Sequence, residues 1–454
     1  MITYSIIQKS HLERGHRLDA EYYQPEYLEV AVKLNSLPHE TLEGISESIV
    51  SFGAYALTNF IEWQDDGIPF IVAENVKEGF ISYEGARYIS DKTDEILKKS
   101  RVREGQVLLS MSGSVGNAAV AYKIPAKLNS NQDITKINLR GKFSPYGLAA
   151  FLNSNYGRMQ VLRLPVGSVQ QHIFIWQTKS LLVPIFPESI INSIDKIYKE
   201  GLDQLQISKS LYSQAEDSLL KELGLKDFKP NEELSYIVNL SNIKSTRRVD
   251  AEYFQPKYRK IEEKLVKDFN AKRIKYLDFI KVTTGQYSEE YTTRDQGRPY
   301  IRGTDLAEGT VNLDNLVYID PDRQIPSKKA KEGDVVVTRV GSIGISARLP
   351  KDVEGGTVSD NLIRLRFPEE TLNSYYVTLF FNTIGSQLMI RESRGSVQAR
   401  LNQETLREIV LPILPKSIQG KVADLVRQSH QARRKAKELL EKAKREVEEF
   451  IEKK

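Results

Sequence analysis

The sequence contains no cysteine in 454 residues. This absence excludes a disulfide scaffold, a thiol nucleophile, a cysteine-ligated zinc ion and an iron–sulfur cluster. The sequence also lacks an apolar run of the ~18 residues that a membrane span requires, and its start, Met1 to Tyr4, does not have the pattern of a signal peptide. We therefore expect a soluble, cytoplasmic protein without a membrane partner.

Net charge is also scarce, because 65 Lys and Arg residues face 60 Asp and Glu residues and leave a formal charge of +5. An excess this small gives little overall attraction to a polyanion, so any nucleic-acid site requires basic residues concentrated on one face. The hydrophobic fraction of 40% is sufficient for buried cores. The length corresponds to about three domains of roughly 150 residues.

The sequence further lacks the motifs of the common catalytic sites. It has no Walker-type phosphate loop, and its short glycine turns, Gly113–Gly116 and Gly341–Gly344, miss the third glycine and the distant acid of a dinucleotide site. It has no Asn/Asp-Pro-Pro-aromatic stretch, and its five histidines are scattered without an i, i+4 pair. We therefore expect no catalytic residue, no metal site and no bound cofactor, and favour a binding function.

A long stretch of the sequence is present twice. Arg17–Tyr27 recurs 231 residues later as Arg248–Tyr258, with eight of eleven positions identical. Three further motifs recur 228 residues apart, namely Glu104–Gly116 with Glu332–Gly344, Gly167–Gln170 with Gly395–Gln398, and Val183–Pro187 with Leu411–Pro415. Because these matches are collinear over about 200 residues, they indicate a tandem duplication.

The first part of each copy, roughly 40–187 and 270–415, has short apolar runs separated by Gly, Pro, Asn and Asp, which is typical of strands and turns. The sequence predicts strands in Gln106–Ser110 and Asp334–Thr338. It predicts one helix over Pro145–Asn153 and its counterpart over Leu372–Asn382.

The second part of each copy is different. Ser189–Leu225 and Ser417–Lys454 contain no proline, and their apolar residues recur at spacings of three and four, which predicts one long amphipathic helix in each copy. A polar helix of ~36 residues has too little neighbouring chain to be buried alone, so we expect the two to pair as an antiparallel coiled coil. Two separate helices, each packed on its own domain, remain the alternative.

The expected fold class is therefore mixed α/β (α+β), with two tandem-repeat globular recognition domains, 1–188 and 228–415, and two helical spacers, 189–227 and 416–454. A helix of this length spans about 54 Å at ~1.5 Å per residue. That is about one and a half turns of B-DNA, given roughly 34 Å per turn. Two similar domains on a rigid spacer are suited to measuring a distance.

The two copies share their framework motifs and differ where loops are expected. Arg, Asn and Gln on such loops are the side chains that recognise base edges, and Ser, Lys and main-chain amides hold phosphates. The candidate DNA contacts of the first copy are Tyr55, Asn75, Arg101, Arg103, Ser112, Gln170 and Gln171. Those of the second copy are Tyr287, Arg294, Arg298, Arg302, Arg339, Ser342, Arg394, Gln398 and Arg400.

Given the repeat, the long helices and these motifs, the chain resembles the DNA specificity (S) subunit of type I restriction–modification systems over nearly its whole length. The motifs that carry the resemblance are Gly297-x-Pro-x-Ile301, Gly333-Asp-Val335 with Gly341-Ser-Ile-Gly344, Gly395-Ser-Val-Gln398 and Leu411-Pro-x-Leu-Pro415. The first copy has Gln106 where the second has Asp334, and we interpret this position as part of a turn.

The resemblance implies that the two recognition domains bind the two halves of a split, asymmetric site in double-stranded DNA, with the helices fixing the gap. It also implies that two methylation (M) subunits dock on the helical regions and supply S-adenosylmethionine-dependent adenine methylation, and that restriction (R) subunits supply ATP-driven translocation and cleavage. The chain itself would then be non-catalytic. Three alternatives stay open: a nuclease or methyltransferase, a protein-binding scaffold, and the recognition subunit of a system that methylates without restricting.

Overall fold

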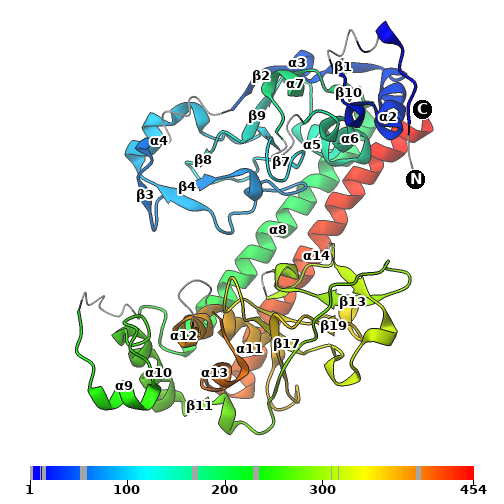
Figure 1. Ribbon diagram of the computed structural model, residues 1–454. Coiled ribbons are helices and arrows are strands. Elements are labelled where there is room, and N and C mark those ends of the chain that lie inside the picture. Colours follow the sequence, from blue (N-terminus) through cyan, green and yellow to red (C-terminus); the bar gives the residue numbers. More distant parts are fainter. Residues whose placement is uncertain are drawn as a thin grey trace. The chain divides into compact units, whose positions relative to one another are not determined.

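The chain forms two compact units in a computed structural model (Figure 1). The structure describes residues 4–10, 12, 17–51, 59–165, 172–228, 235–307, 309–314, 316–394 and 400–454. The first unit comprises Met1–Gln206 with Arg433–Lys454, and the second comprises Ile207–Ala432. Both units mix strands and helices, as the sequence predicts.

The first unit is built from short strands with helices packed on them. Its strands are β1 (His39–Thr41), β2 (Ser46–Val50), β3 (Trp63–Gln64), β4 (Ile68–Ile71), β5 (Arg87–Ile89), β6 (Val107–Ser110), β7 (Ala118–Val120), β8 (Asn129–Ser130), β9 (Ile134–Leu139) and β10 (Leu182–Pro184). Its helices are α2 (Pro25–Asn35), α3 (Leu42–Ile45), α4 (Asp91–Ile96), α5 (Pro145–Asn153), α6 (Asn155–Leu162) and α7 (Ile175–Lys179). The strands form sheets in the orders β2-β9-β6-β7, β3-β5-β4-β8 and β1-β10.

Strand β6 lies between two hydrophobic cores of the first unit. Val107 and Leu109 belong to the core that includes the helices, and Leu108 belongs to a second core with Ile71 and Val76. Successive side chains of a strand point to opposite faces, so an uninterrupted apolar run produces a strand that is buried on both sides.

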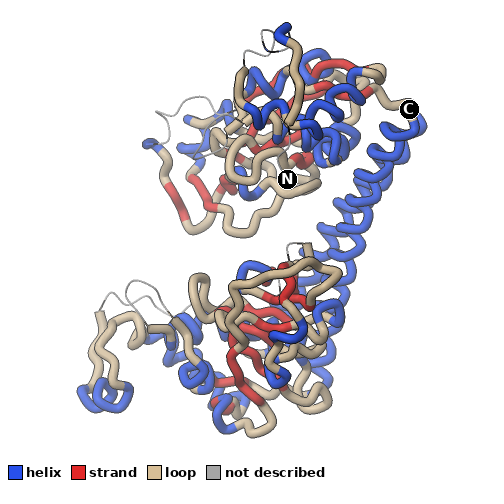
Figure 2. The backbone as a smooth tube through the Cα atoms, turned by 45° about the vertical axis from the view of Figure 1, so that its right-hand side comes forward, coloured by secondary structure: helices blue, strands red, loops and turns tan. Residues whose placement is uncertain are grey.

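The second unit has the same kind of construction, with short strands joined by long loops (Figure 2). Its strands are β11 (Lys272–Arg273), β12 (Lys281–Thr284), β13 (Arg298–Ile301), β14 (Leu306–Ala307), β15 (Thr310–Val311), β16 (Val317–Ile319), β17 (Val335–Thr338), β18 (Ser346–Arg348), β19 (Thr357–Val358), β20 (Leu362–Arg366) and β21 (Val410–Leu411). Its helices are α9 (Leu240–Thr246), α10 (Pro256–Phe269), α11 (Ser374–Phe380), α12 (Ser386–Glu392) and α13 (Gln403–Arg407).

The sequence repeat is a structural repeat. The sheet order β12-β20-β17-β18 reproduces β2-β9-β6-β7. Each unit also contains a short parallel strand pair, β4 with β8 in the first and β13 with β19 in the second. The two pairs have equivalent registers (Phe70↔Asn129 and Tyr300↔Thr357). The strands predicted in Gln106–Ser110 and Asp334–Thr338 are confirmed as β6 and β17.

The two long helices are α8 (Glu188–Glu222) and α14 (Lys416–Lys453), within a few residues of their predicted bounds. In the first unit, Tyr198 in the N-terminal half of α8 shares a core with Val447 near the end of α14. A Cβ atom at Gly201 would lie 3.2 Å from Leu440 Cγ, so the two helices approach closely there. None of the helices in the described part of the chain combines the length and apolar character of a membrane span.

In the second unit, the opposite ends of the same helices pair. Leu219 and Leu223 of α8 share a core with Val422 and Val426 of α14. Ser208 Oγ and Ser429 Oγ are 3.1 Å apart, and Ser429 Oγ also donates to the Ser208 carbonyl (2.7 Å). The start of one helix thus pairs with the end of the other, so α8 and α14 run antiparallel, as predicted.

The helix predicted over Pro145–Asn153 is confirmed as α5, and its counterpart begins at Ser374 rather than at Leu372. Asn153 lies four residues before Gly157, whereas Asn382 lies three residues before Gly385. In the first unit the extra residue is accommodated by a break, where the Ser154 side chain caps α6. In the second unit the chain passes through a π-helical turn, Phe381–Gly385, into α12.

Candidate nucleic-acid interface

A glycine turn follows the central strand in each unit, at Ser110–Gly116 after β6 and Thr338–Gly344 after β17. The hydroxyl at the start of each turn closes it, because Ser110 Oγ donates to the Ser114 carbonyl and Thr338 Oγ1 donates to the Ser342 carbonyl (2.5 Å). The glycines have positive φ, 66° and 92° in the first turn and 76° and 88° in the second. These glycines therefore allow the backbone to take a positive φ, which residues with a Cβ atom rarely adopt.

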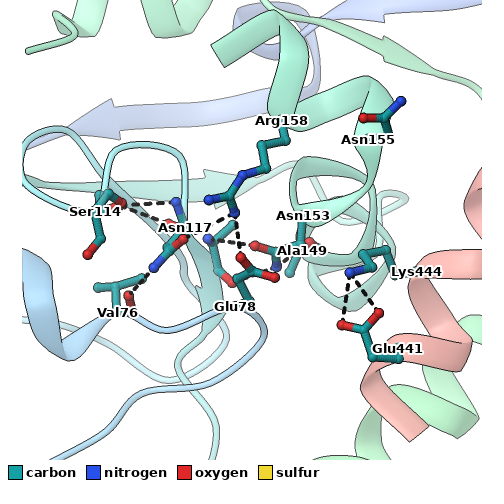
Figure 3. Close-up of polar contacts among 12 residues, drawn as sticks. Val76, Glu78, Ser114, Asn117, Ala149, Asn153, Asn155, Arg158, Glu441 and Lys444 are labelled. Atoms are coloured by element: carbon teal, nitrogen blue, oxygen red, sulfur yellow. Dashed lines mark hydrogen bonds and ion pairs between the residues drawn. The ribbon is translucent and has the colours of Figure 1, made fainter. Parts of the chain in front are cut away.

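A polar network surrounds Asn117, the residue that follows the first glycine turn (Figure 3). The Asn117 amide donates to the Val76 carbonyl (3.1 Å), and Arg158 bridges Glu78 (2.6 Å) and the Asn117 amide oxygen (3.4 Å). Asn153 exchanges two hydrogen bonds with the first residue of β7 (2.7 and 3.0 Å). In the second unit, Asn382 makes the same pair of bonds to the first residue of β18 (2.9 and 2.8 Å).

The end of a second loop adjoins each glycine turn. In the first unit, Ile173 N donates to the Met111 carbonyl (3.0 Å), and Ser112 pairs with His172 in an isolated antiparallel β-bridge. In the second unit, Leu401 N donates to the Arg339 carbonyl (2.9 Å), and Val340 is bridged to Arg400. The backbone arrangement is therefore the same in both units, whereas the side chains at these positions differ.

In the second unit this arrangement brings three predicted arginines together. Arg394 and Arg400 exchange two main-chain hydrogen bonds (2.9 and 2.8 Å), and Arg400 lies beside the turn that carries Arg339. Arg339 Nη1 donates to the Asp360 carbonyl (3.3 Å), while its buried Nε has no hydrogen-bond partner among the described residues. Ser342 is exposed on the same turn.

The remaining predicted residues of the second unit lie on other segments. Tyr287 is exposed on the loop after β12, where its hydroxyl donates to Glu289. Arg294 and Arg298 are exposed before and on β13. Arg302 is bound to the buried carboxylate of Asp305 (2.9 Å), and this hydrogen bond raises the pKa of the guanidinium.

In the first unit, several predicted residues have roles within the fold. Asn75 is buried, and its amide oxygen accepts from Val72 N (2.8 Å). Arg101 is paired with the buried Asp94 (2.7 Å), whose hydrogen bond raises the pKa of Arg101. Arg103 is exposed, and Ser112 is buried at the bridge to His172. Tyr55, Gln170, Gln171 and, in the second unit, Gln398 lie outside the described residues.

Three residues with defined contacts or exposure were not in the predicted set, namely Arg17, Phe174 and Trp176. Arg17 donates to the main-chain carbonyls of Leu164 (2.8 Å) and Pro165 (3.1 Å), just before residues 166–171. Phe174 and Trp176, just after them, are exposed aromatic side chains. Arg17 could have been found from the sequence, because it begins a motif that is repeated. Phe174 and Trp176 could have been found because the second copy has non-aromatic residues at the equivalent positions.

The position of Gln106 and Asp334 is part of a turn in both units. Gln106 Oε1 accepts from Arg103 N (2.8 Å), and Asp334 Oδ2 accepts from Lys331 N (2.9 Å). Asp334, which is buried, has a further role because it forms an ion pair with Arg366 (2.6 Å).

A family model identifies the second part of the chain. Residues 267–445 match the model of the type I restriction modification DNA specificity domain. By this match, the segment is similar to the DNA specificity domains of type I systems. The match confirms, over residues 267–445, the resemblance inferred from the sequence.

Solved structures match the chain at low identity over most of its length. The S subunit of the type I system from M. genitalium is 13% identical, and the match covers 92% of this chain and 96% of that one, with a TM-score of 0.35. The HsdS subunit from Thermoanaerobacter tengcongensis is 12% identical, with 91% and 95% covered and a TM-score of 0.28. A chain from a structure on assembly and conformational transition of a type I system is 15% identical, with 92% and 98% covered and a TM-score of 0.30. No curated protein matches the chain.

Proposed function

We propose that this chain, as the DNA-recognition subunit of a type I restriction–modification complex, binds a bipartite, asymmetric site in double-stranded DNA. The first unit recognises one half-site and the second recognises the other. The observation that carries this proposal is a duplicated contact between the glycine turn and the end of the second loop, which we call the junction. It joins residues 111–112 to 172–173 in the first unit and residues 339–340 to 400–401 in the second, with the same backbone hydrogen bonds in both. Met111 and His172 in one unit stand where Arg339 and Arg400 stand in the other. A common scaffold with different side chains suits the recognition of two different sequences.

The base contacts of the second half-site come from the junction and the loop after β12. Arg339, Arg394, Arg400, Ser342 and Tyr287 are the candidates there, and Arg294 and Arg298 are candidates on the neighbouring segment. Arg103 and Ser112 are candidates in the first unit. Asn75, Arg101 and Arg302 serve the fold, because their polar groups are already bound to Val72, Asp94 and Asp305.

The paired helices α8 and α14 set the gap between the half-sites. A continuous helix of 35 residues, α8, is about 52 Å long at ~1.5 Å per residue. An antiparallel pair is stiffer than a single helix, because the apolar face of each helix packs against the other helix.

The chain contributes recognition and no catalysis, and it recruits catalytic partners. Two methylation subunits dock on the helical regions, where the duplication offers two equivalent surfaces. Restriction subunits join this complex. S-adenosylmethionine and ATP are bound by these partners, and this chain binds no cofactor.

Selection from a random double-stranded DNA library with the purified full-length chain tests the proposal. Recovery of two short sequences separated by a fixed gap supports it, whereas a motif with one half alone contradicts the two-unit assignment. Recovery of no motif favours a protein-binding scaffold. Turnover by the single chain with DNA, divalent metal and S-adenosylmethionine would instead make it an enzyme. Methylome mapping and restriction of unmodified phage in cells carrying the gene with its neighbours distinguish a complete system from one that only methylates.

A further inference from the structure

Two aromatic side chains of the first unit are exposed beside the glycine turn. Phe174 is 45% exposed and Trp176 is 69% exposed. The His172 ring lies edge-on against Phe174, with ring centres 5.1 Å apart. His172 is the residue bridged to Ser112, so the aromatic group begins at the junction described above.

The backbone under these rings is firmly held. Phe174 N donates to the Gln177 side chain (2.8 Å), and that side chain donates to the Leu164 carbonyl (2.7 Å). Ile173 is buried, and its amide donates to the Met111 carbonyl. The segment is therefore anchored through Ile173 and Gln177, while the side chains of Phe174 and Trp176 stay partly exposed. Exposed aromatic surface next to a polar site is typical of a binding surface.

The second unit shows that the fold does not require aromatic residues here. At the positions 228 residues later it has Asn402 and Glu404. Asn402 caps α13 by accepting from Thr405 N (2.8 Å), so the backbone of this turn forms equally well with polar side chains. Phe174 and Trp176 are thus specific to the first unit.

This asymmetry bears on the ligand. A partner that docks in two copies on the two repeats requires the same residues in both, and these residues are not the same. DNA recognition is the property in which the two units must differ. Aromatic side chains bind DNA by stacking on bases or by entering an opened base step, and apolar wedges of this kind unstack and kink the duplex.

We propose that Phe174 and Trp176 form a base-stacking site, with His172 supporting Phe174, that contacts nucleobases exposed by local distortion of the first half-site. The inference rests on the proposed function. In the second unit Arg400 occupies the position of His172, so recognition there relies on hydrogen bonding rather than on stacking. The two half-sites are therefore distinguished by deformability as well as by base edges.

The test uses the full-length chain and a duplex carrying the motif that the wild type selects, with 2-aminopurine placed in turn at each position of each half-site. We expect wild-type binding to change the fluorescence at one or two positions of the first half-site only. Trp176→Ala is expected to abolish that signal and to weaken binding about tenfold or more. Trp176→Tyr is expected to keep most of both. The salt dependence of binding is expected to stay unchanged, because no phosphate contact is lost.

Glu404→Ala, at the equivalent position of the second unit, is the matched control and is expected to leave the signal and the affinity unchanged. Both side chains are exposed, so the melting temperature of each variant serves as the check on folding. Wild-type affinity and fluorescence in Trp176→Ala and in Phe174→Ala would overturn the proposal. If these variants bind DNA normally but lose the methylation subunit, the surface is a protein-docking site and the proposal is wrong. If the wild type selects no motif at all, the proposed function itself fails, and the stacking site fails with it.

Discussion

Arg17 donates a hydrogen bond from its guanidinium to the main-chain carbonyl of Leu164 (2.8 Å). The relationship recurs in the second unit, where Arg248 donates to the carbonyl of Glu392 (3.2 Å). Each arginine is held in turn by the aspartate two residues later, Asp19 or Asp250. In both units this contact joins the segment before the globular part to main-chain carbonyls shortly before residues 166–171 or 395–399, so this part of the backbone is held by a residue far away in sequence.

Replacing one anchor is expected to affect one half-site only. Arg248→Ala removes the hydrogen bonds to Glu392 and Ser393, which precede Arg394. We expect weaker and less selective binding at the second half-site and unchanged preference at the first. Motif selection with the variant chain measures both half-sites in a single experiment.

Arg17→Ala is the reciprocal variant, and each serves as the other's control. It is expected to relax the first half-site and to leave the second unchanged. A uniform loss of affinity at both half-sites, with either variant, would assign these arginines to general stability rather than to loop positioning.

The duplication allowed the sequence to predict much of the fold. Equivalent motifs marked β6 and β17, and the absence of proline after Pro187 and Pro415 marked α8 and α14 to within a few residues at their ends. These features depend on local periodicity and on backbone requirements, which are written in neighbouring residues. The pairing of the helices was predicted because each has an apolar seam and too little neighbouring chain to bury it alone.

The candidate site was less predictable, because the state of a polar side chain depends on partners that the fold supplies. Arg101 and Arg339 are both candidate loop arginines in the sequence, yet the Arg101 guanidinium is paired with Asp94, whereas the Arg339 guanidinium donates to the Asp360 carbonyl. Trp176 was not among the predicted residues, and its apolar neighbours in the sequence do not distinguish an exposed aromatic residue from a buried one. Its exposure is visible only once α7 is placed.

Lys136 on β9 should make stability depend on pH. It is fully buried and donates to Ser130 Oγ (2.8 Å), and burial lowers its pKa to about 7. The corresponding residue of the second unit, Arg364, lies near the buried carboxylate of Asp334, which the first unit replaces with Gln106. The unfolded chain holds the lysine proton up to about pH 10.5, whereas the folded chain releases it near pH 7. The free-energy cost of burying the charged lysine therefore lowers the stability of the fold fully below pH 7, and this cost declines as the pH rises towards 10.5.

Lys136→Met is expected to raise the free energy of unfolding at pH 6 to 7 by on the order of 1–3 kcal/mol, with the gain shrinking towards pH 10. Urea unfolding followed by circular dichroism at pH 6, 8 and 10 measures the difference. Lys142→Met, at an exposed position shortly after the same strand, is expected to show no pH-dependent gain. A gain for Lys136→Met that is the same at all three pH values would contradict the assigned pKa.

Arg339→Lys tests direct recognition of a base. An arginine that binds a guanine edge through two hydrogen bonds loses about 1–3 kcal/mol of discrimination when one of them is removed. We expect this loss at one base pair of the second half-site, measured by competition with duplexes carrying each of the four pairs at each position. Arg302→Lys is the control, because its guanidinium is already bound to Asp305 and its replacement should leave base preference unchanged. A loss of affinity that is equal for all sequences would identify Arg339 as a phosphate contact.

The gap between the half-sites is expected to follow the length of the paired helices. Inserting seven residues in α8 next to Ser208 and seven in α14 next to Ser429 lengthens both partners by two turns and keeps their apolar faces aligned. The added length is about 10.5 Å at ~1.5 Å per residue, which corresponds to about three base pairs at ~3.4 Å each. We expect motif selection to return the same two half-site sequences with a gap about three base pairs longer. An insertion in α8 alone leaves the seam unmatched, so that variant is expected to lose stability and fixed spacing together. Altered base preference at an unchanged gap, in the doubly lengthened chain, would show that the helices do not set the spacing.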